Sequence, residues 1–264
     1  MRILTRMLAV LATCAASLCH SATATTDFTD LWFPPSEAGW GANILQQNDI
    51  LFVTLFVSNQ SNAPVWYVAS NVALSSTANG VFTFTGPLYV ATAPYFGGPF
   101  NPANVSVRQV GTLTFTTSQI STATLTYSVD GVNVIKSIAR FAWKNENVAG
   151  NYLGATTGTW TNCGAARNGY QENPSALTVS QDGVAITMRE DGPNYTCTYS
   201  GNYSQAGHMG TITGNATCSD GINQSFVATE VVGGVNYLTM RLSAQQLQGQ
   251  CLFTGRMGGM RRSP

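Results

Sequence analysis

Residues 30–70 read DLWFPPSEAGWGANILQQNDILFVTLFVSNQSNAPVWYVAS, and this stretch decides the expected fold. It holds three of the five Trp residues, a Pro-Pro corner that begins at Pro34, and two Gly residues that flank Trp40. The run from Ile50 to Val57 is almost continuously apolar, as expected for a strand that closes a hydrophobic core. The pattern predicts the first half of an aromatic-rich β-domain.

The strand pattern continues to about residue 145. The expected strands are Asp30–Phe33, Trp40–Gln46, Ile50–Val57, Pro64–Ser70, Val81–Thr85, Val105–Thr116, Ile120–Val129 and Val132–Trp143. Asp130-Gly131 is a strong hairpin signal, and the Gly-, Pro- and aromatic-rich segment 86–102 is predicted as a loop. About eight sequential strands without a helix predict an antiparallel meander, closed as a barrel or packed as a sandwich.

A second domain is indicated by a shift in composition. Residues 25–145 hold no Cys, whereas four Cys follow, so we place the boundary at the polar segment 144–147. The expected domains are a signal peptide at 1–24, an aromatic-rich β-domain at 25–145 and a small disulfide-containing β-barrel at 146–264. The second domain restarts at Ala149–Tyr152, and strands are expected to follow near Ala176–Gln181, Val184–Glu190, Tyr195–Ser204, Met209–Thr217, Gln224–Val231, Tyr237–Leu242 and Gln250–Arg256, with Ser243–Leu247 as a brief helix or turn. The fold class is therefore all-β, with two antiparallel meander barrels or sandwiches in tandem.

The N-terminus predicts export. Arg2 and Arg6 precede a short apolar run, and Ala22-Thr23-Ala24 then offers a cleavage site, so the mature chain is expected to begin at Thr25. A lipoprotein signal ending at Cys14 is the less favoured alternative. The apolar run is too short to span a bilayer, and no later segment has the pattern of a transmembrane helix. The expected location is the periplasm or the extracellular medium.

The four remaining cysteines form an even set in an exported chain, which implies two disulfides. A hairpin that turns near Ala206 places Cys197 almost opposite Cys218, so we expect these two to be bonded. Cys163 and Cys251 then pair. Four cysteines allow three pairings, and this is the one that the hairpin favours.

The charge pattern excludes one class of partner. Charged residues make up 9% of the chain, and removal of the signal leaves ten basic against twelve acidic residues, a net charge of −2. Nucleic-acid binding needs clustered Lys and Arg that displace counterions, so no nucleic-acid partner is expected.

Three segments of the chain resemble parts of known exported proteins. Residues 36–67 resemble a module of uncharacterised exported proteobacterial proteins with the pattern ESGWG, a QQGD-like turn, LFATLF and WY. The matching residues are Ser36, Gly39, Trp40, Gly41, Gln46, Gln47, Asp49, Leu51, Phe52, Pro64, Trp66 and Tyr67. Asn48 replaces the usual turn Gly, and Ala38 stands where Ser is common. Residues 93–115 and the Cys-containing segment 195–221 are also similar to parts of such proteins. The resemblance implies export and a β-fold, and it implies no activity.

Catalytic and metal sites are not indicated. The mature chain has one His, His208, in a turn where solvent exposure is expected, and no GxSxG nucleophile motif. One His and four disulfide cysteines leave no ligand set with zinc spacing, so neither a metal nor another cofactor is expected. Glu190 and Asp191 are interpreted as a solvated acidic turn, with a calcium-like role less favoured.

Two carboxylates in the first domain define a minor alternative. Asp30 and Glu37 lie beside Trp32 and Trp40, and a hydrolase would use two such groups. The favoured interpretation is that Glu37 starts a turn or pairs with an arginine, Arg108 or Arg140.

Aromatic side chains are the remaining candidates for function, because they stack on sugar rings or apolar ligands. A core role is favoured for the two Trp of the set, whereas the Gly-Pro loop is expected to expose its aromatics. The candidate ligand-binding residues are Tyr89, Tyr95, Phe96, Trp40, Trp66 and Glu37.

Three functions follow from these observations. The leading hypothesis is a non-enzymatic exported protein that binds a small apolar molecule or a glycan through the aromatic loop. The second is a structural or protein-interaction module of the cell envelope. The third, least favoured, is a hydrolase that uses Asp30 or Glu37.

Overall fold

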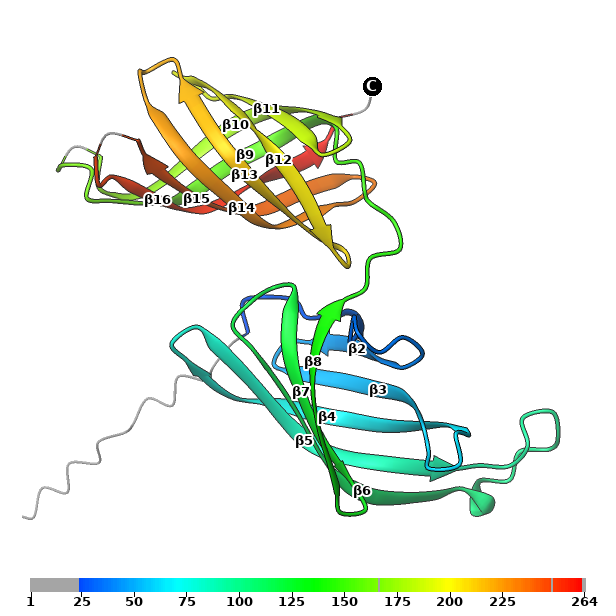
Figure 1. Cartoon of the computed structure of the whole chain (residues 1–264). Coiled ribbons are helices and arrows are strands. Elements are labelled where there is room, and N and C mark those ends of the chain that lie inside the picture. The colour runs from blue at the N-terminus through cyan, green and yellow to red at the C-terminus, as the bar shows by residue number, and fades with distance from the viewer. Residues whose placement is uncertain (1–23, 166, 248, 263–264) are drawn as a thin grey trace, which may run out of the picture.

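The computed structural model describes residues 24–262, except 166 and 248. The chain forms two closed antiparallel barrels of eight strands each, in which every strand pairs with its neighbours in the sequence (Figure 1). The predicted all-β class with two tandem barrels is confirmed. Among the residues described, no helix is long and apolar enough to cross a membrane.

The first barrel is a simple meander. Its strands are β1 (Asp30–Phe33), β2 (Gly41–Gln47), β3 (Ile50–Ser58), β4 (Pro64–Ala78), β5 (Val81–Thr92), β6 (Ser106–Thr117), β7 (Thr122–Val129) and β8 (Val132–Arg140), with a short 3-10 turn, η1 (Pro102–Asn104), before β6. The short strand β1 closes the barrel by pairing with β2 on one side and β8 on the other.

The core of the first barrel comes from the opening stretch of the sequence. Along β3, alternate residues Leu51, Val53 and Leu55 are fully buried, which is the period of two that a strand imposes. Trp32 is buried beside them, and its indole N–H donates to the backbone oxygen of Phe28 at 3.0 Å. Each large apolar side chain buried in this way stabilises the fold by about 1.5–3 kcal/mol.

One predicted loop is partly wrong. The segment 86–102 was expected to be irregular throughout, but β5 continues to Thr92, so Tyr89 lies in a strand and is half-buried. Gly86 allows the backbones of β5 and β4 to approach closely, because a Cβ atom at this position would overlap the backbone of Asn71 on β4.

The second barrel repeats the architecture. Its strands are β9 (Gly150–Thr161), β10 (Gly169–Asp182), β11 (Ala185–Asp191), β12 (Thr196–Ala206), β13 (Met209–Cys218), β14 (Asn223–Gly233), β15 (Tyr237–Gln246) and β16 (Leu252–Arg261). The first strand, β9, pairs with the last, β16, and closes the barrel. The brief helix or turn predicted at Ser243–Leu247 is wrong, because Leu242 and Ala244 continue the buried alternation and β15 runs on to Gln246.

Both predicted disulfides are confirmed. Cys197 and Cys218 are direct cross-strand partners on β12 and β13 and are bonded to each other. Cys163 bonds to Cys251 across 88 residues of sequence, and so links the end of β9 to the start of β16. This second bond therefore clamps the two strands that close the barrel.

The two barrels touch through a hairpin tip. The turn between β12 and β13 brings His208 to the first barrel, where its backbone N–H and its Nδ1 each lie 2.9 Å from Asp30 Oδ2. Arg140, buried in the first barrel, holds the same carboxylate at 3.1 Å. The expectation that His208 is simply solvent-exposed is therefore wrong, because the turn lies against a second barrel that spacing along the chain does not reveal.

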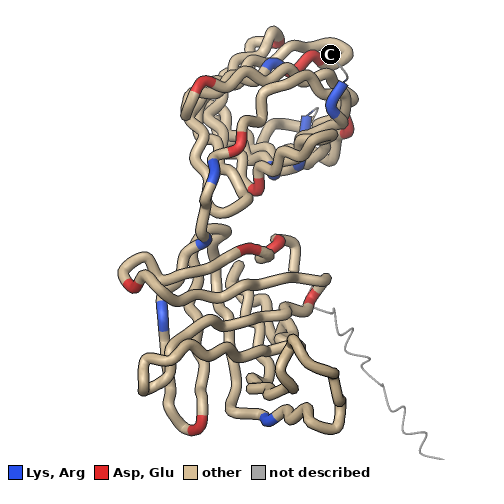
Figure 2. The backbone as a smooth tube through the Cα atoms, turned by 90° about the vertical axis from the view of Figure 1, so that its right-hand side faces the viewer, with Lys and Arg blue, Asp and Glu red and all other residues tan. Residues whose placement is uncertain are grey.

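A second contact involves the segment before β1. Thr26 donates its hydroxyl proton to Glu230 Oε1 at 2.7 Å, and Arg241 donates to the backbone oxygen of Thr25 at 3.2 Å. Residues 141–149 form the connection between the barrels (Figure 1). Figure 2 shows the charged residues as mostly isolated positions along both barrels.

Candidate functional site

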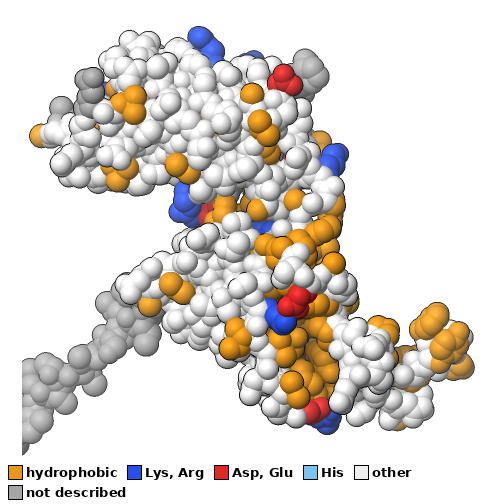
Figure 3. All heavy atoms as spheres, viewed as in Figure 1, with side chains coloured by type: hydrophobic (Ala, Val, Ile, Leu, Met, Phe, Trp, Pro, Cys, Tyr) orange, Lys and Arg blue, Asp and Glu red, His pale blue; other side chains and the backbone are white. Residues whose placement is uncertain are grey.

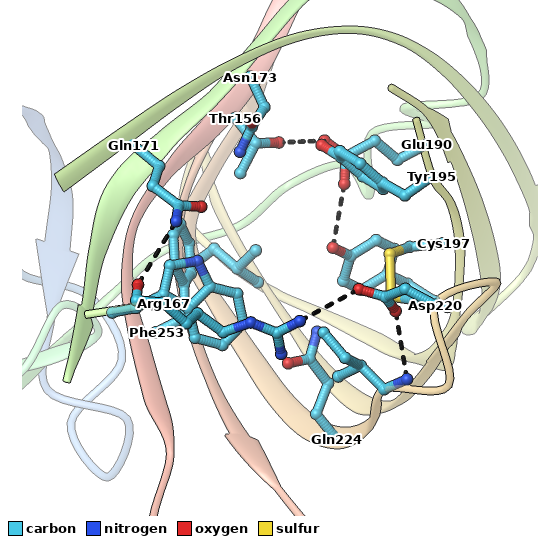
Figure 4. A pocket seen from close by; sticks show the side chains of 15 residues that line it. Thr156, Arg167, Gln171, Asn173, Glu190, Tyr195, Cys197, Asp220, Gln224 and Phe253 are labelled. Atoms are coloured by element: carbon cyan, nitrogen blue, oxygen red, sulfur yellow. Dashed lines mark hydrogen bonds and ion pairs between the residues drawn. A yellow bond between two sulfur atoms is a disulfide. The ribbon is translucent and has the colours of Figure 1, made fainter. Parts of the chain in front are cut away.

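The second barrel contains a cavity of about 140 Å³ (Figure 4). Side chains from all eight strands of the barrel line it, together with residues of the connections that follow β9, β11 and β13. The cavity combines polar groups with an aromatic wall, which is the composition typical of small-molecule sites. The lining residues are Thr156, Trp160, Arg167, Gln171, Asn173, Glu190, Tyr195, Cys197, Tyr199, Cys218, Asp220, Ile222, Gln224, Leu242 and Phe253.

Glu190 is the central polar group of the cavity. It follows Ile186 and Met188 on the inward face of β11, and its side chain is only 1% exposed. Thr156 donates to its Oε1 at 2.5 Å. Two tyrosine hydroxyl groups also donate to it: Tyr195, in the turn before β12, to Oε1 at 3.0 Å, and Tyr199, on β12, to Oε2 at 3.1 Å.

Glu190 has hydroxyl partners but no cationic one within the described residues, where the ion pairs that the structure contains involve other carboxylates. Burial first, and then the nearby carboxylate, raise the pKa of both Tyr195 and Tyr199. Both phenols therefore stay protonated and act as hydrogen-bond donors at neutral pH. The carboxylate oxygens are left as the main acceptors of the cavity.

Gln224 adds an unused acceptor. The residue lies on β14 with 4% of its surface exposed, and its Oε1 is buried without a hydrogen-bond partner in the structure. An unsatisfied buried polar atom costs about 1–3 kcal/mol, so such atoms are rare unless something else binds them.

The apolar side of the cavity is aromatic. Trp160 on β9 and Phe253 on β16 lie 5.0 Å apart between ring centroids. Arg167 lies over the Trp160 ring at 5.5 Å and also pairs with Asp220 at 3.3 Å. The ion pair thus joins the connection after β9 to the connection after β13, as the dashed line in Figure 4 shows. The Cys197–Cys218 bond fixes the strands beneath it.

The arrangement offers hydrogen-bonding groups and aromatic surface to a small molecule. The polar groups of its lining include carboxylate, amide and hydroxyl oxygens, and aromatic rings form part of its wall. The described residues contain no group of three or more His, Cys, Asp or Glu side chains that could hold a metal ion.

Two of the sequence-predicted residues lie together in the first barrel. The indole N–H of Trp40 donates to Glu37 Oε2 at 2.9 Å, and Lys136 contacts both Glu37 oxygens at 2.7 and 2.9 Å. These residues border an open groove that Tyr127 and Val57 also line. The arginine partners expected for Glu37 are wrong, because Lys136 takes that place while Arg108 and Arg140 pair with other carboxylates.

The other four candidates lie elsewhere. Tyr95 and Phe96 are 71% and 94% exposed in the connection between β5 and β6, and their rings contact each other at 4.8 Å. Figure 3 shows this connection as an apolar projection from the first barrel. Trp66 lies on the outer face of β4, paired with Phe56 and 50% exposed, so the core role favoured for it is wrong. Tyr89 stays within β5.

The structure gives the hydrolase alternative little support. Burial alone would raise the pKa of Asp30, but hydrogen bonds from His208 and Arg140 outweigh it and lower that pKa. The Lys136 ammonium, followed by the Trp40 N–H, lowers the pKa of Glu37. A glycosidase acid requires a raised pKa, so both carboxyl groups are shifted in the unsuitable direction.

Sequence reasoning missed the main site. Glu190 was predicted to lie in a solvated turn, but it occupies an inward strand position, and Asp191 beside it pairs with Arg189 at 2.7 Å on the outside. The sequence did contain a signal, because Ile186, Met188 and Glu190 are alternate residues and therefore lie on the same face of the strand.

Comparison of the chain with family models gives no match, and comparison with curated proteins gives none either. Among solved structures, the chain is similar to a protein of unknown function from the DUF3598 family of Nostoc punctiforme PCC 73102. The identity is 9%, the alignment covers 89% of this chain and 94% of that one, and the TM-score is 0.27.

Proposed function

We propose that this chain is an exported, non-enzymatic binding protein that takes a small molecule into the interior of its second barrel. The observation that carries the proposal is the unpartnered Oε1 of Gln224, buried in a cavity that also holds the carboxylate of Glu190. A folded barrel that only needed a core would fill this position with apolar side chains, because a buried acceptor without a partner lowers stability. A ligand would supply the missing donor.

The proposal shifts the binding site away from the aromatic loop of the first barrel. Tyr95 and Phe96 project from their barrel with most of their side-chain surface exposed. Their exposure favours a second candidate function for this loop, which is docking onto a partner of the cell envelope. The two functions concern different barrels and are compatible.

An NMR fragment screen of the purified protein tests the proposed function. We expect a ring-sized fragment to shift the backbone amide signals of Glu190 and Gln224. Leu242→Phe places a larger side chain in the cavity and should weaken that fragment at least about tenfold, because it occupies the same space. Ser243→Phe is the matched control, since Ser243 is the next residue of β15 and is exposed on the outside.

Equal binding by Leu242→Phe and Ser243→Phe would contradict the site. A screen in which no fragment responds to Leu242→Phe would contradict the function itself and favour the docking role of the loop. Thermal unfolding of both variants shows whether each remains folded.

A further inference from the structure

The lining of the cavity holds more carboxyl groups than cationic groups. Besides the phenols of Tyr195 and Tyr199, its ionisable side chains are those of Arg167, Asp220 and Glu190. Arg167 and Asp220 pair with each other at the mouth, which leaves the deeper Glu190 as the uncompensated group. Buried charges in proteins are normally paired, because their transfer out of water is costly.

We propose that the ligand is a small organic cation, a primary ammonium or an amidinium group attached to a flat ring. This inference rests on the proposed function and names the chemical class that the site selects. The cationic group would lie against Glu190 and supply the opposite charge that the described residues do not.

The hydrogen-bond inventory favours a cation that carries N–H donors. A carboxylate has about four acceptor positions, and three hydroxyl groups occupy three of them around Glu190. Gln224 Oε1 presents a further acceptor with no partner. A primary ammonium or an amidinium offers two or more N–H groups that can donate to the remaining acceptor position of Glu190, whereas a quaternary ammonium offers none.

The size and lining of the cavity indicate the size and shape of the uncharged part of the ligand. A cavity of about 150 Å³ accommodates one benzene molecule, and this cavity has about 140 Å³. Trp160, Phe253, Tyr195 and Tyr199 surround that volume with ring faces and edges. Aromatic faces also attract cations, which adds to the electrostatic preference.

Three molecules with the same ring test the inference. Benzamidine is cationic, benzamide is neutral, and benzoate is anionic, so their affinities, measured by NMR titration or calorimetry on the purified protein, isolate the effect of charge. We expect benzamidine to bind at least about tenfold more tightly than benzamide, since hydrogen bonds to charged groups are the stronger ones. Benzoate should bind most weakly, because Glu190 repels it.

Matched Glu→Gln variants locate the effect. Glu190→Gln keeps the shape of the side chain and should remove the preference for benzamidine over benzamide. Glu172→Gln is the control, because Glu172 is exposed on β10 between the cavity-lining residues Gln171 and Asn173, and it should leave the preference unchanged.

The outcomes separate the two proposals. Benzamide or benzoate binding as tightly as benzamidine overturns the cation preference, and so does a preference that survives in Glu190→Gln. If none of the three binds while another fragment still responds to Leu242→Phe, the preference fails and the binding function stands. The wild-type ranking decides the question even if Glu190→Gln does not fold.

Discussion

At the scale of single residues, the cavity depends on one carboxylate and the hydroxyl groups around it. Glu190 faces inward because side chains alternate along β11. Tyr195 reaches it from the turn before β12, and Tyr199 reaches it from β12 itself. The phenols are held in their neutral form by burial and by that carboxylate, which raise their pKa values. The same arrangement makes the second barrel less stable at alkaline pH.

The expected alkaline effect has a defined sign. Burial raises the pKa of Tyr203 to about 12, and the pKa values of Tyr195 and Tyr199 are also raised, whereas an unfolded tyrosine has a pKa of about 10. Above pH 10 the unfolded chain therefore binds fewer protons than the folded barrel, so the free energy of unfolding is maximal below that pH and falls as pH rises toward 12.

Urea unfolding between pH 8 and pH 11.5 measures this slope. Tyr199→Phe removes one of the phenols and should make the slope shallower. The control is Tyr237→Phe, at an exposed position of β15. Identical slopes for the wild type and Tyr199→Phe would contradict the prediction.

Residue patterns also explain what the sequence could and could not predict. Asp130-Gly131 and the apolar run of β3 specify local structure, so the hairpins and most strands were predicted correctly. The partner of Glu37 could not be predicted, because Lys136 is brought to it only by the pairing of strands far apart in sequence. Glu190 was missed because two adjacent acidic residues suggest a solvated turn, unless one considers that adjacent residues of a strand lie on opposite faces.

At the scale of elements, hairpin turns do two different things in this molecule. Most reverse the chain in solvent, whereas the β12–β13 turn also contacts the first barrel. Gly207 in that turn has φ +60°, and a Cβ atom on it would overlap the carboxylate of Asp30. Gly183, in the β10–β11 turn, has nearly the same backbone angle, φ +58°, but no atom within 4 Å of that Cβ position.

This pair of glycines gives a matched test of the inter-barrel contact. Gly207→Ala and Gly183→Ala should each cost about 1–2 kcal/mol of stability, because Ala disfavours the left-handed backbone region. Only Gly207→Ala should also displace the hairpin from Asp30 and change the relative orientation of the barrels. Residual dipolar couplings report that orientation, and an equal change in both variants would show that the turn geometry, and not the contact, is responsible.

At the scale of the whole molecule, the two barrels use different means to hold the same topology. In the described residues, both disulfides lie in the second barrel, whereas the first closes through strand pairing around an aromatic cluster that includes Phe28, Trp32 and Phe115. The tandem organisation could be predicted because the cysteines change abruptly along the chain. The contact between the barrels could not, because no local pattern encodes it.

Reduction should therefore affect one barrel selectively. Loss of a native disulfide typically costs 2–5 kcal/mol, so a reductant should lower the unfolding temperature of the second barrel and leave that of the first. Hydrogen exchange followed by NMR distinguishes the two barrels. A joint shift of both would show that they unfold as one cooperative unit.

The two disulfides should also differ from each other. On the chain-entropy account, removing Cys163–Cys251, with a sequence separation of 88, should cost about 1 kcal/mol more than removing Cys197–Cys218, with a separation of 21. Double Cys→Ala variants of each pair, compared by urea unfolding, measure that difference. An equal loss would contradict the entropic reasoning.

The meander order of both barrels has a consequence for how the protein matures. Each barrel closes only when its last strand reaches its first, β8 to β1 and then β16 to β9. In an exported chain that crosses a membrane N-terminus first, all eight strands of the first barrel emerge before any strand of the second. The first barrel can then close without disulfide formation in its described residues, whereas closure of the second requires β16, next to which Cys251 bonds to Cys163. For such an exported chain, closure of the first barrel would therefore come before closure and disulfide formation in the second.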